Sequence, residues 1–73
     1  MSKLPVSSGR ECISALERAG YIVIRQRGSH ISLYRNDPPS QVVVPNHKEL
    51  DRGTLRAIIR QAGLSVDEFI ALL

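Results

Sequence analysis

Cysteine and aromatic residues are scarce in this sequence. It contains one cysteine, no tryptophan, two tyrosines and one phenylalanine among 73 residues. A single cysteine, Cys12, excludes an internal disulfide, and its apolar neighbours at helical spacing indicate a buried thiol rather than a nucleophile. The two histidines have no cluster of cysteine or carboxylate ligands beside them, so no metal site is predicted.

Long apolar runs are also missing. No stretch approaches the length of a membrane span, and residues 1–6 lack the apolar run of a signal peptide. We therefore expect a cytoplasmic protein that does not contact a membrane. Residues 1–73 are expected to form one domain with a thin core, because a chain of this length buries only about 60% of its unfolded surface. Such a domain has no room for a deep cofactor cleft, and no cofactor is expected.

Acidic residues are outnumbered by basic ones. Ten lysines and arginines against seven aspartates and glutamates give a formal net charge of +3 and a pI near 9.6. A positive balance favours polyanions, because binding releases their condensed counterions. Charge of this size does not by itself separate a nucleic acid from an acidic protein partner.

Capping residues and apolar spacing predict three amphipathic helices. Ser8 begins a capping box, and the helix that follows it ends at Gly20. Asp51 caps a second helix, expected over residues 52–62. Ser65 begins a second capping box and a short last helix. Each helix carries its apolar residues three or four positions apart, as expected when one side faces a core.

Between the first two helices, the sequence predicts three strands. Residues 21–24, 31–34 and 41–44 are rich in β-branched and aromatic side chains. Residues 36–40 contain two prolines and are predicted to form a turn, because proline cannot donate to a strand ladder. The three strands are expected to form an antiparallel meander with the helices on one face. The predicted class is α+β: helix, three-stranded sheet, helix and a short C-terminal helix.

Gly28 and Ser29 are predicted to form a two-residue hairpin turn, so that Arg27 pairs with His30. If side chains alternate strictly between the two faces of the sheet, the side chains facing the helices are those of Ile22, Ile24, Ile31 and Leu33. The side chains on the opposite face are those of Tyr21, Val23, Arg25, Arg27, His30, Ser32 and Tyr34. A bulge or a one-residue slip would change this partition. The predicted open face is basic and partly aromatic, and it carries a histidine.

His30 is the leading candidate for chemistry. Imidazole exchanges protons near neutral pH, and the guanidinium groups of Arg25 and Arg27 can bind phosphate in a fixed fork. A histidine among arginines therefore suits phosphodiester chemistry. The alternative is a surface histidine in a turn, with no role in a reaction.

Other candidates lie in the polar connector over residues 46–50 and at the start of the second helix. Lys48 and Arg52 are candidate phosphate contacts. His47 is either a second acid/base group or a structural residue that fixes the start of the helix. Arg52, Arg56 and Arg60 lie on one helix face, which could follow an RNA backbone, meet an acidic partner or simply be solvated.

The turn and the aromatic residues have alternatives too. Gly28 and Ser29 are expected to contact RNA through the turn, and Ser29 either orients His30 or caps the turn. Tyr21 and Tyr34 could stack on a base, or they could cover neighbouring strands as aromatic residues often do.

Three segments together resemble the HicA toxins of bacterial and archaeal toxin–antitoxin pairs. They are residues 25–30 with Gly-Ser-His, residues 43–47 with Val-Pro-Asn-His, and residues 53–65 with Gly-Thr-Leu-Arg and Gln-Ala-Gly. The Gly-Ser-His turn alone is a weak signal, but the three motifs in order and at this spacing are specific. The resemblance covers nearly the whole chain.

The resemblance implies a fold like that of double-stranded-RNA-binding domains. It also implies an mRNA-cleaving toxin, inhibited by an antitoxin of the HicB type, in which the catalytic histidine corresponds to His30. Without a metal ion, the simplest route uses the 2′-hydroxyl of the RNA as nucleophile, with His30 as general acid or base. Two rivals remain: a non-catalytic double-stranded-RNA-binding module, and a domain that only binds an acidic protein.

Overall fold

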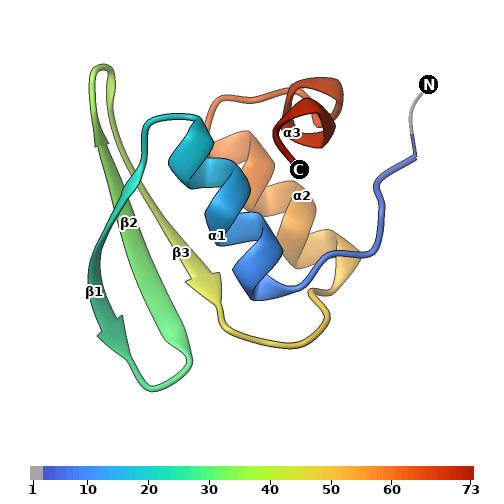
Figure 1. Cartoon of the computed structure of the whole chain (residues 1–73), viewed down its shortest axis with the longest axis horizontal. Coiled ribbons are helices and arrows are strands. Elements are labelled where there is room, and N and C mark those ends of the chain that lie inside the picture. The colour runs from blue at the N-terminus through green and yellow to red at the C-terminus, as the bar shows by residue number, and fades with distance from the viewer. Residues whose placement is uncertain (1–2) are drawn as a thin grey trace.

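Residues 3–73, which the computed structural model describes, fold into three helices and one three-stranded antiparallel sheet (Figure 1). In chain order the elements are α1 (Gly9–Arg18), β1 (Ile22–Arg27), β2 (His30–Asn36), β3 (Pro39–Pro45), α2 (Arg52–Gln61) and α3 (Val66–Leu72). This is the α+β order, similar to that of double-stranded-RNA-binding domains, that the sequence predicts. No helix in this part of the chain is both long and apolar enough to cross a membrane.

The predicted helix caps are confirmed. Ser8 and Glu11 exchange hydrogen bonds between side chain and backbone at the start of α1, and Ser65 and Glu68 do the same at α3. The Asp51 carboxylate accepts hydrogen bonds from two backbone amides in the first turn of α2. These bonds satisfy amides that have no partner inside their own helix.

The strands are longer than predicted, and the proline turn is shorter. Arg27 pairs with His30 across a two-residue turn, as expected. Asn36 pairs with Pro39, so residues 37–38 alone form the second turn. The prediction of a turn over residues 36–40 was therefore wrong at both ends. A proline fits there because β3 is an edge strand and Pro39 is its first residue.

A bulge interrupts the pairing of β1 with β2. Val23 pairs with Leu33 and Arg25 pairs with Ser32, which leaves Ile24 as an extra residue in β1. Side chains of directly paired residues point to the same face of a sheet. Val23 therefore shares the helix side with Leu33, which is fully buried.

The bulge overturns part of the predicted face assignment. Ile22 and Ile24 were expected to face the helices, but their side chains are 61% and 48% exposed. Ile22 pairs with Tyr34 and lies on the open face, where Val23 was expected. One extra residue reverses the alternation of every residue before it, so a strict period of two fails at this point.

The helices cover one face of the sheet, and the other face is open (Figure 1). Both α1 and α2 pack against β3, while β1 contacts chiefly β2. Phe69 of α3 is fully buried, whereas Leu73, which follows α3, is 46% exposed. The core consists of Leu4, Cys12, Ala15, Leu16, Tyr21, Ile31, Leu33, Val42, Val44, Leu50, Leu55, Ile58, Ile59, Ala62 and Phe69.

Candidate functional site

The β1–β2 turn sets the position of His30. Gly28 has a φ of 56°, a left-handed conformation that glycine adopts without the steric cost of a side chain. The Gln26 side-chain amide donates a hydrogen bond of 3.1 Å to the Gly28 carbonyl and braces the turn. His30 is the first residue of β2, and its side chain is exposed. Its neighbour across the ladder is Arg27.

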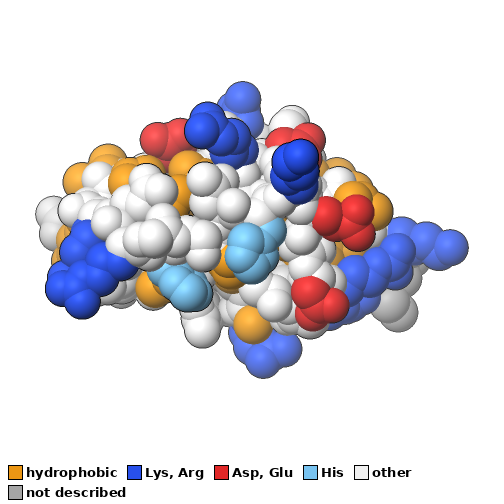
Figure 2. Space-filling view, turned by 90° about the horizontal axis from the view of Figure 1, so that it is seen from below, with side chains coloured by type: hydrophobic (Ala, Val, Ile, Leu, Met, Phe, Trp, Pro, Cys, Tyr) orange, Lys and Arg blue, Asp and Glu red, His pale blue; other side chains and the backbone are white. Residues whose placement is uncertain are grey.

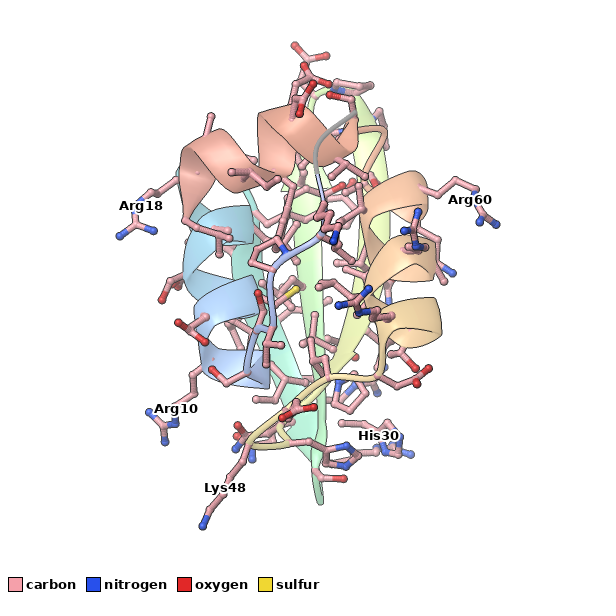
Figure 3. All side chains as sticks on the ribbon, turned by 90° about the vertical axis from the view of Figure 1, so that its right-hand side faces the viewer. Arg10, Arg18, His30, Lys48 and Arg60 are labelled. Carbon is pink, nitrogen blue, oxygen red and sulfur yellow. The ribbon has the colours of Figure 1, made fainter. Side chains whose placement is uncertain are left out.

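The segment that follows β3 is joined to this turn. The backbone amide of Asn46 donates a hydrogen bond of 2.6 Å to the Ser29 carbonyl, and His30 pairs with Pro45. His30 and Lys48 consequently lie at the same end of the molecule (Figure 3). Figure 2, which views this end, shows both histidine side chains at the surface with both basic and acidic side chains around them.

The same segment is also joined to the start of α1. The Gly9 amide donates to the His47 carbonyl at 2.8 Å, and the Leu50 amide donates to the Ser7 carbonyl at 2.8 Å. Gly9 cannot carry a side chain here, because a Cβ atom would collide with the Pro45 carbonyl oxygen. The β1–β2 turn, the segment after β3 and the start of α1 therefore form one hydrogen-bonded unit.

This unit adds Arg10, which the sequence reasoning missed. A surface pocket of about 370 Å³ is lined by Ser8, Arg10, Asn46, His47 and Lys48. On the sequence, Arg10 is only a polar residue in the first turn of the first helix. No signal in the local sequence would have placed it beside Lys48.

The open face of the sheet consists of rows of paired residues. The row nearest the turn contains Arg27, His30 and Pro45. The next row contains Arg25, Ser32 and Val43, and the third contains Ile22, Tyr34 and Gln41. The structure thus brings together two guanidinium groups, one imidazole and one aromatic ring on a face that no helix covers.

The two tyrosines have different environments. Tyr21 is only 2% exposed, and its hydroxyl donates a hydrogen bond of 2.7 Å to Ser40 Oγ. The Arg35 guanidinium lies over its ring, 4.9 Å from the centroid. Tyr21 is therefore a core residue and cannot stack on a base, whereas Tyr34 is half-buried on the open face.

The arginines of α2 are spread along the helix. Arg52 is its first residue and follows the segment that carries Lys48, close to the His30 end of the molecule. Arg60 lies far from His30 along the molecule (Figure 3). Arg52, Arg56 and Arg60 are all exposed. Of the three, only Arg52 lies next to the unit that holds His30.

Other potential reactive groups lie elsewhere or are shielded. Cys12 is fully buried, and burial raises the pKa of its thiol to about 12, so the nucleophilic thiolate is suppressed at neutral pH. Within residues 3–73, no group of three or more histidine, cysteine, aspartate or glutamate side chains is arranged to hold a metal ion.

The sequence matches one protein family over most of its length. The family is described as the HicA toxin of bacterial toxin–antitoxin systems, and the match covers residues 9–64. The matched region runs from the first residue of α1 to the end of α2 and includes all three strands. No curated protein matches the chain. Because the family match covers well over half of its residues, the chain belongs to the HicA toxin family, whose members act as toxins with an antitoxin as partner.

Proposed function

We propose that this toxin, acting in the cytoplasm as one domain, is a metal-independent endoribonuclease that cleaves mRNA, with His30 as its acid/base catalyst. The observation that carries the proposal is the row Arg27–His30–Pro45 on the open face. An exposed imidazole directly beside a guanidinium can exchange a proton with RNA while the guanidinium holds the phosphate. The hydrogen-bonded unit around His30 supports this role, because it holds the imidazole on a ladder rather than on a free loop.

In the proposed reaction, the 2′-hydroxyl oxygen of the RNA attacks the adjacent phosphorus. As general base, His30 accepts the hydroxyl proton, and the bond from phosphorus to the 5′-oxygen breaks. The leaving oxygen takes a proton from a general acid, and the products are a 2′,3′-cyclic phosphate and a 5′-hydroxyl. His30 could equally be that general acid, with the two roles exchanged. Arg25 and Arg27 would stabilise the negative charge that develops on the phosphorane oxygens.

The remaining proposed contacts to RNA are made by residues at the same end of the molecule as His30. Gly28 and Ser29 form the tip of the hairpin, while Lys48 and Arg52 flank the segment joined to it. The Gly28 backbone and the side chains of Ser29, Lys48 and Arg52 would bind phosphates on either side of the scissile bond and set the register of the strand. His47 is either the second acid/base group or a residue whose backbone alone matters. Its amide and carbonyl both make hydrogen bonds, while its side chain is exposed.

The antitoxin is proposed to be of the HicB type. Family membership supports an antitoxin partner, and the resemblance of the sequence motifs to HicA toxins supports this particular type. Inhibition would follow if the antitoxin covered the open face, because the proposed catalytic row has no cover of its own.

The test compares the intact chain with His30→Ala and His47→Ala. Each protein is induced in bacteria, and growth and mRNA integrity are followed. We expect His30→Ala to abolish growth arrest and to slow cleavage at least about 100-fold, as expected on loss of an acid/base group. His47→Ala should keep the fold, since its backbone bonds persist, so its activity reports the role of the imidazole alone. Circular dichroism checks the folding of all three proteins.

Cleavage products and metal dependence separate the alternatives. We expect a 2′,3′-cyclic phosphate at the new 3′ ends and unchanged rates in EDTA. Products with a 3′-hydroxyl, or activity lost to EDTA, would remove the proposed mechanism. If a folded wild-type chain binds double-stranded RNA but never cleaves any RNA, the non-catalytic binding module is correct instead. Double-stranded-RNA-binding domains, whose fold this chain resembles, bind RNA mainly by its shape.

A further inference from the structure

The two edges of the sheet differ in how they are protected. The β3 edge begins at Pro39 and ends at Pro45, and both α1 and α2 pack against this strand. Proline and covering helices are devices that prevent an edge strand from pairing with another chain. β1 contains no proline, and every one of its residues is exposed. The bulge at Ile24 is the one protective irregularity in this strand.

The unprotected edge is apolar at its N-terminal half. The exposed fractions of Ile22, Val23 and Ile24 are 61%, 46% and 48%. These three residues are half of the large hydrophobic side chains that are exposed within residues 3–73. A contiguous apolar patch on an exposed strand edge marks a contact site for another chain.

The free backbone groups of β1 can be assigned from the hairpin. In a two-residue hairpin, the residues flanking the turn exchange backbone hydrogen bonds, and this pattern alternates along the strand. Arg27 and Arg25 therefore direct their backbone groups toward β2. Because Ile24 is the extra residue of the bulge, the pair after Arg25–Ser32 is Val23–Leu33. The N–H and C=O groups of Val23 and Gln26 therefore point away from β2, where a further strand would meet them.

A groove lies beside this edge, between β1 and α1. It has a volume of about 340 Å³, and it is lined by Arg10, Ile13, Ser14, Glu17, Val23, Gln26, Ile31 and Asn46. Val23 and Gln26 share the helix side with Leu33 and Ile31, so an added strand would direct every second side chain into this groove. Ile13, Val23 and Ile31 offer apolar contacts there.

Charge distinguishes between possible occupants of the edge. The C-terminal half of β1 carries Arg25 and Arg27 on the open face, Arg10 flanks the groove, and the chain has a formal net charge of +3. A second copy of this chain would bring a second set of arginines and the same net charge. An acidic segment would place carboxylates opposite the arginines, an arrangement that stabilises cross-strand pairs.

We propose that the free edge of β1 receives an extended segment of the antitoxin as a fourth, antiparallel strand of the sheet. The segment would alternate, with carboxylates opposite Arg25 and Arg27 on the open face and apolar side chains in the groove. Neighbouring strands lie about 4.8 Å apart, so the added strand would lie two strand spacings from His30. Its carboxylates would neutralise Arg27, which belongs to the proposed catalytic row, and Arg25 in the next row. The proposal depends on membership of the toxin family, not on the ribonuclease mechanism.

The test uses the intact toxin and the purified intact antitoxin encoded beside it. Val23→Lys places a charge at the edge and groove, and Leu73→Lys is the matched control because both side chains are 46% exposed. We expect Val23→Lys to weaken antitoxin binding at least about tenfold, measured by calorimetry, while Leu73→Lys binds like the wild type. Circular dichroism verifies that both variants are folded.

Amide hydrogen exchange identifies strand addition directly. In the complex, we expect the amides of Val23 and Gln26 to exchange at least about tenfold more slowly than in the free toxin. Unchanged exchange at both amides, or equal binding by the two lysine variants, would overturn the proposal. If these two amides exchange more slowly in the toxin alone as its concentration rises, the proposal is also overturned, because the edge then pairs with a second copy of the toxin. None of these readouts requires RNA cleavage, so they stand even if the proposed mechanism fails.

Discussion

Burial in the core strongly changes the pKa of Cys12. Its thiol is fully buried among the apolar residues of α1 and the sheet, and no solvent reaches it. Burial penalises the thiolate and raises the pKa from an ordinary value of 9.0 to about 12. The buried, unreactive thiol inferred from helical spacing is thus confirmed, and it has a measurable consequence.

We expect stability to decline in alkali because of Cys12. Between pH 9.0 and about 12, the thiol ionises in the unfolded chain but keeps its proton in the folded one. The unfolded state then binds fewer protons, so the free energy of unfolding falls as pH rises, by at most about 1.4 kcal/mol per pH unit. The contribution is fully present below pH 9. Urea unfolding between pH 8 and roughly pH 10.5 measures this decline, over the range where the thiol of the unfolded chain titrates.

Cys12→Ala is the reference for this measurement. It loses some packing and should be less stable at every pH, but it lacks the thiol titration. The difference in unfolding free energy between wild type and Cys12→Ala should therefore shrink as pH rises. Tyrosine and lysine titrations cancel in that difference. Parallel pH curves for the two proteins would show that Cys12 does not titrate as its burial predicts.

At the scale of elements, the junction between α1 and the segment after β3 organises the proposed site. Two backbone hydrogen bonds, from Gly9 to His47 and from Leu50 to Ser7, hold these two stretches side by side. The close approach requires glycine at position 9. A Cβ at this position would collide with the Pro45 carbonyl oxygen and would lie 3.0 Å from the Asn46 Cα atom and 3.1 Å from the His47 nitrogen. All three are backbone atoms, so none can move as a flexible side chain would.

We expect Gly9→Ala to destabilise the protein despite the better helix propensity of alanine. Replacing glycine by alanine in a helix gains at most about 1 kcal/mol. Forcing a methyl group against fixed backbone costs about 1–3 kcal/mol, so the steric cost prevails. Thermal unfolding followed by circular dichroism measures the outcome.

Gly53→Ala provides the matched control. Gly53 lies in the first turn of α2, and a Cβ there would approach only the Asp51 carboxylate, at 3.1 Å. We expect this variant to stay within about 0.5 kcal/mol of the wild type, as surface substitutions usually do. If Gly9→Ala is as stable as Gly53→Ala, the segment after β3 can move away from α1 at little cost in free energy, and the contact between them is not rigid.

For the whole molecule, the position of positive charge matters more than its total. A formal net charge of +3 is modest for a chain of this length. Arg10 and Lys48 lie toward the same end of the molecule as His30, while Arg60 and Arg18 lie farther along it (Figure 3). The proposed RNA contacts are Arg25 and Arg27 on the open face, together with Lys48 in the segment after β3 and Arg52 at the start of α2.

We expect RNA binding to depend strongly on salt. Each phosphate neutralised on a single strand contributes about −0.7 to the slope of log affinity against log salt, so four contacts predict a slope near −3. The measurement is fluorescence anisotropy with a short single-stranded RNA, using His30→Ala so that nothing is cleaved. Lys48→Ala should reduce the slope by about 0.7, whereas Arg60→Ala should leave it unchanged. Equal effects of the two substitutions would show that the contacts are not concentrated at the His30 end.

The candidate site could be predicted in part from local sequence. The Gly28-Ser29 turn and the pairing of Arg27 with His30 were both predicted correctly. The Ile24 bulge and the burial of Tyr21 were not. A bulge depends on the fit of two strands, and Tyr21 is drawn into the core by packing and by its hydrogen bond to Ser40, which the structure places in β3.

Signals within three or four residues of one another were enough to define the helix starts, the two-residue hairpin and a histidine beside an arginine. Such features depend on capping bonds and on backbone conformations that a few neighbouring side chains control. Only tertiary structure joined Gly9 to His47, brought Arg10 beside Lys48 and left β1 as the unprotected edge. These outcomes depend on how separate elements pack against a shared core, and no local pattern contains that information.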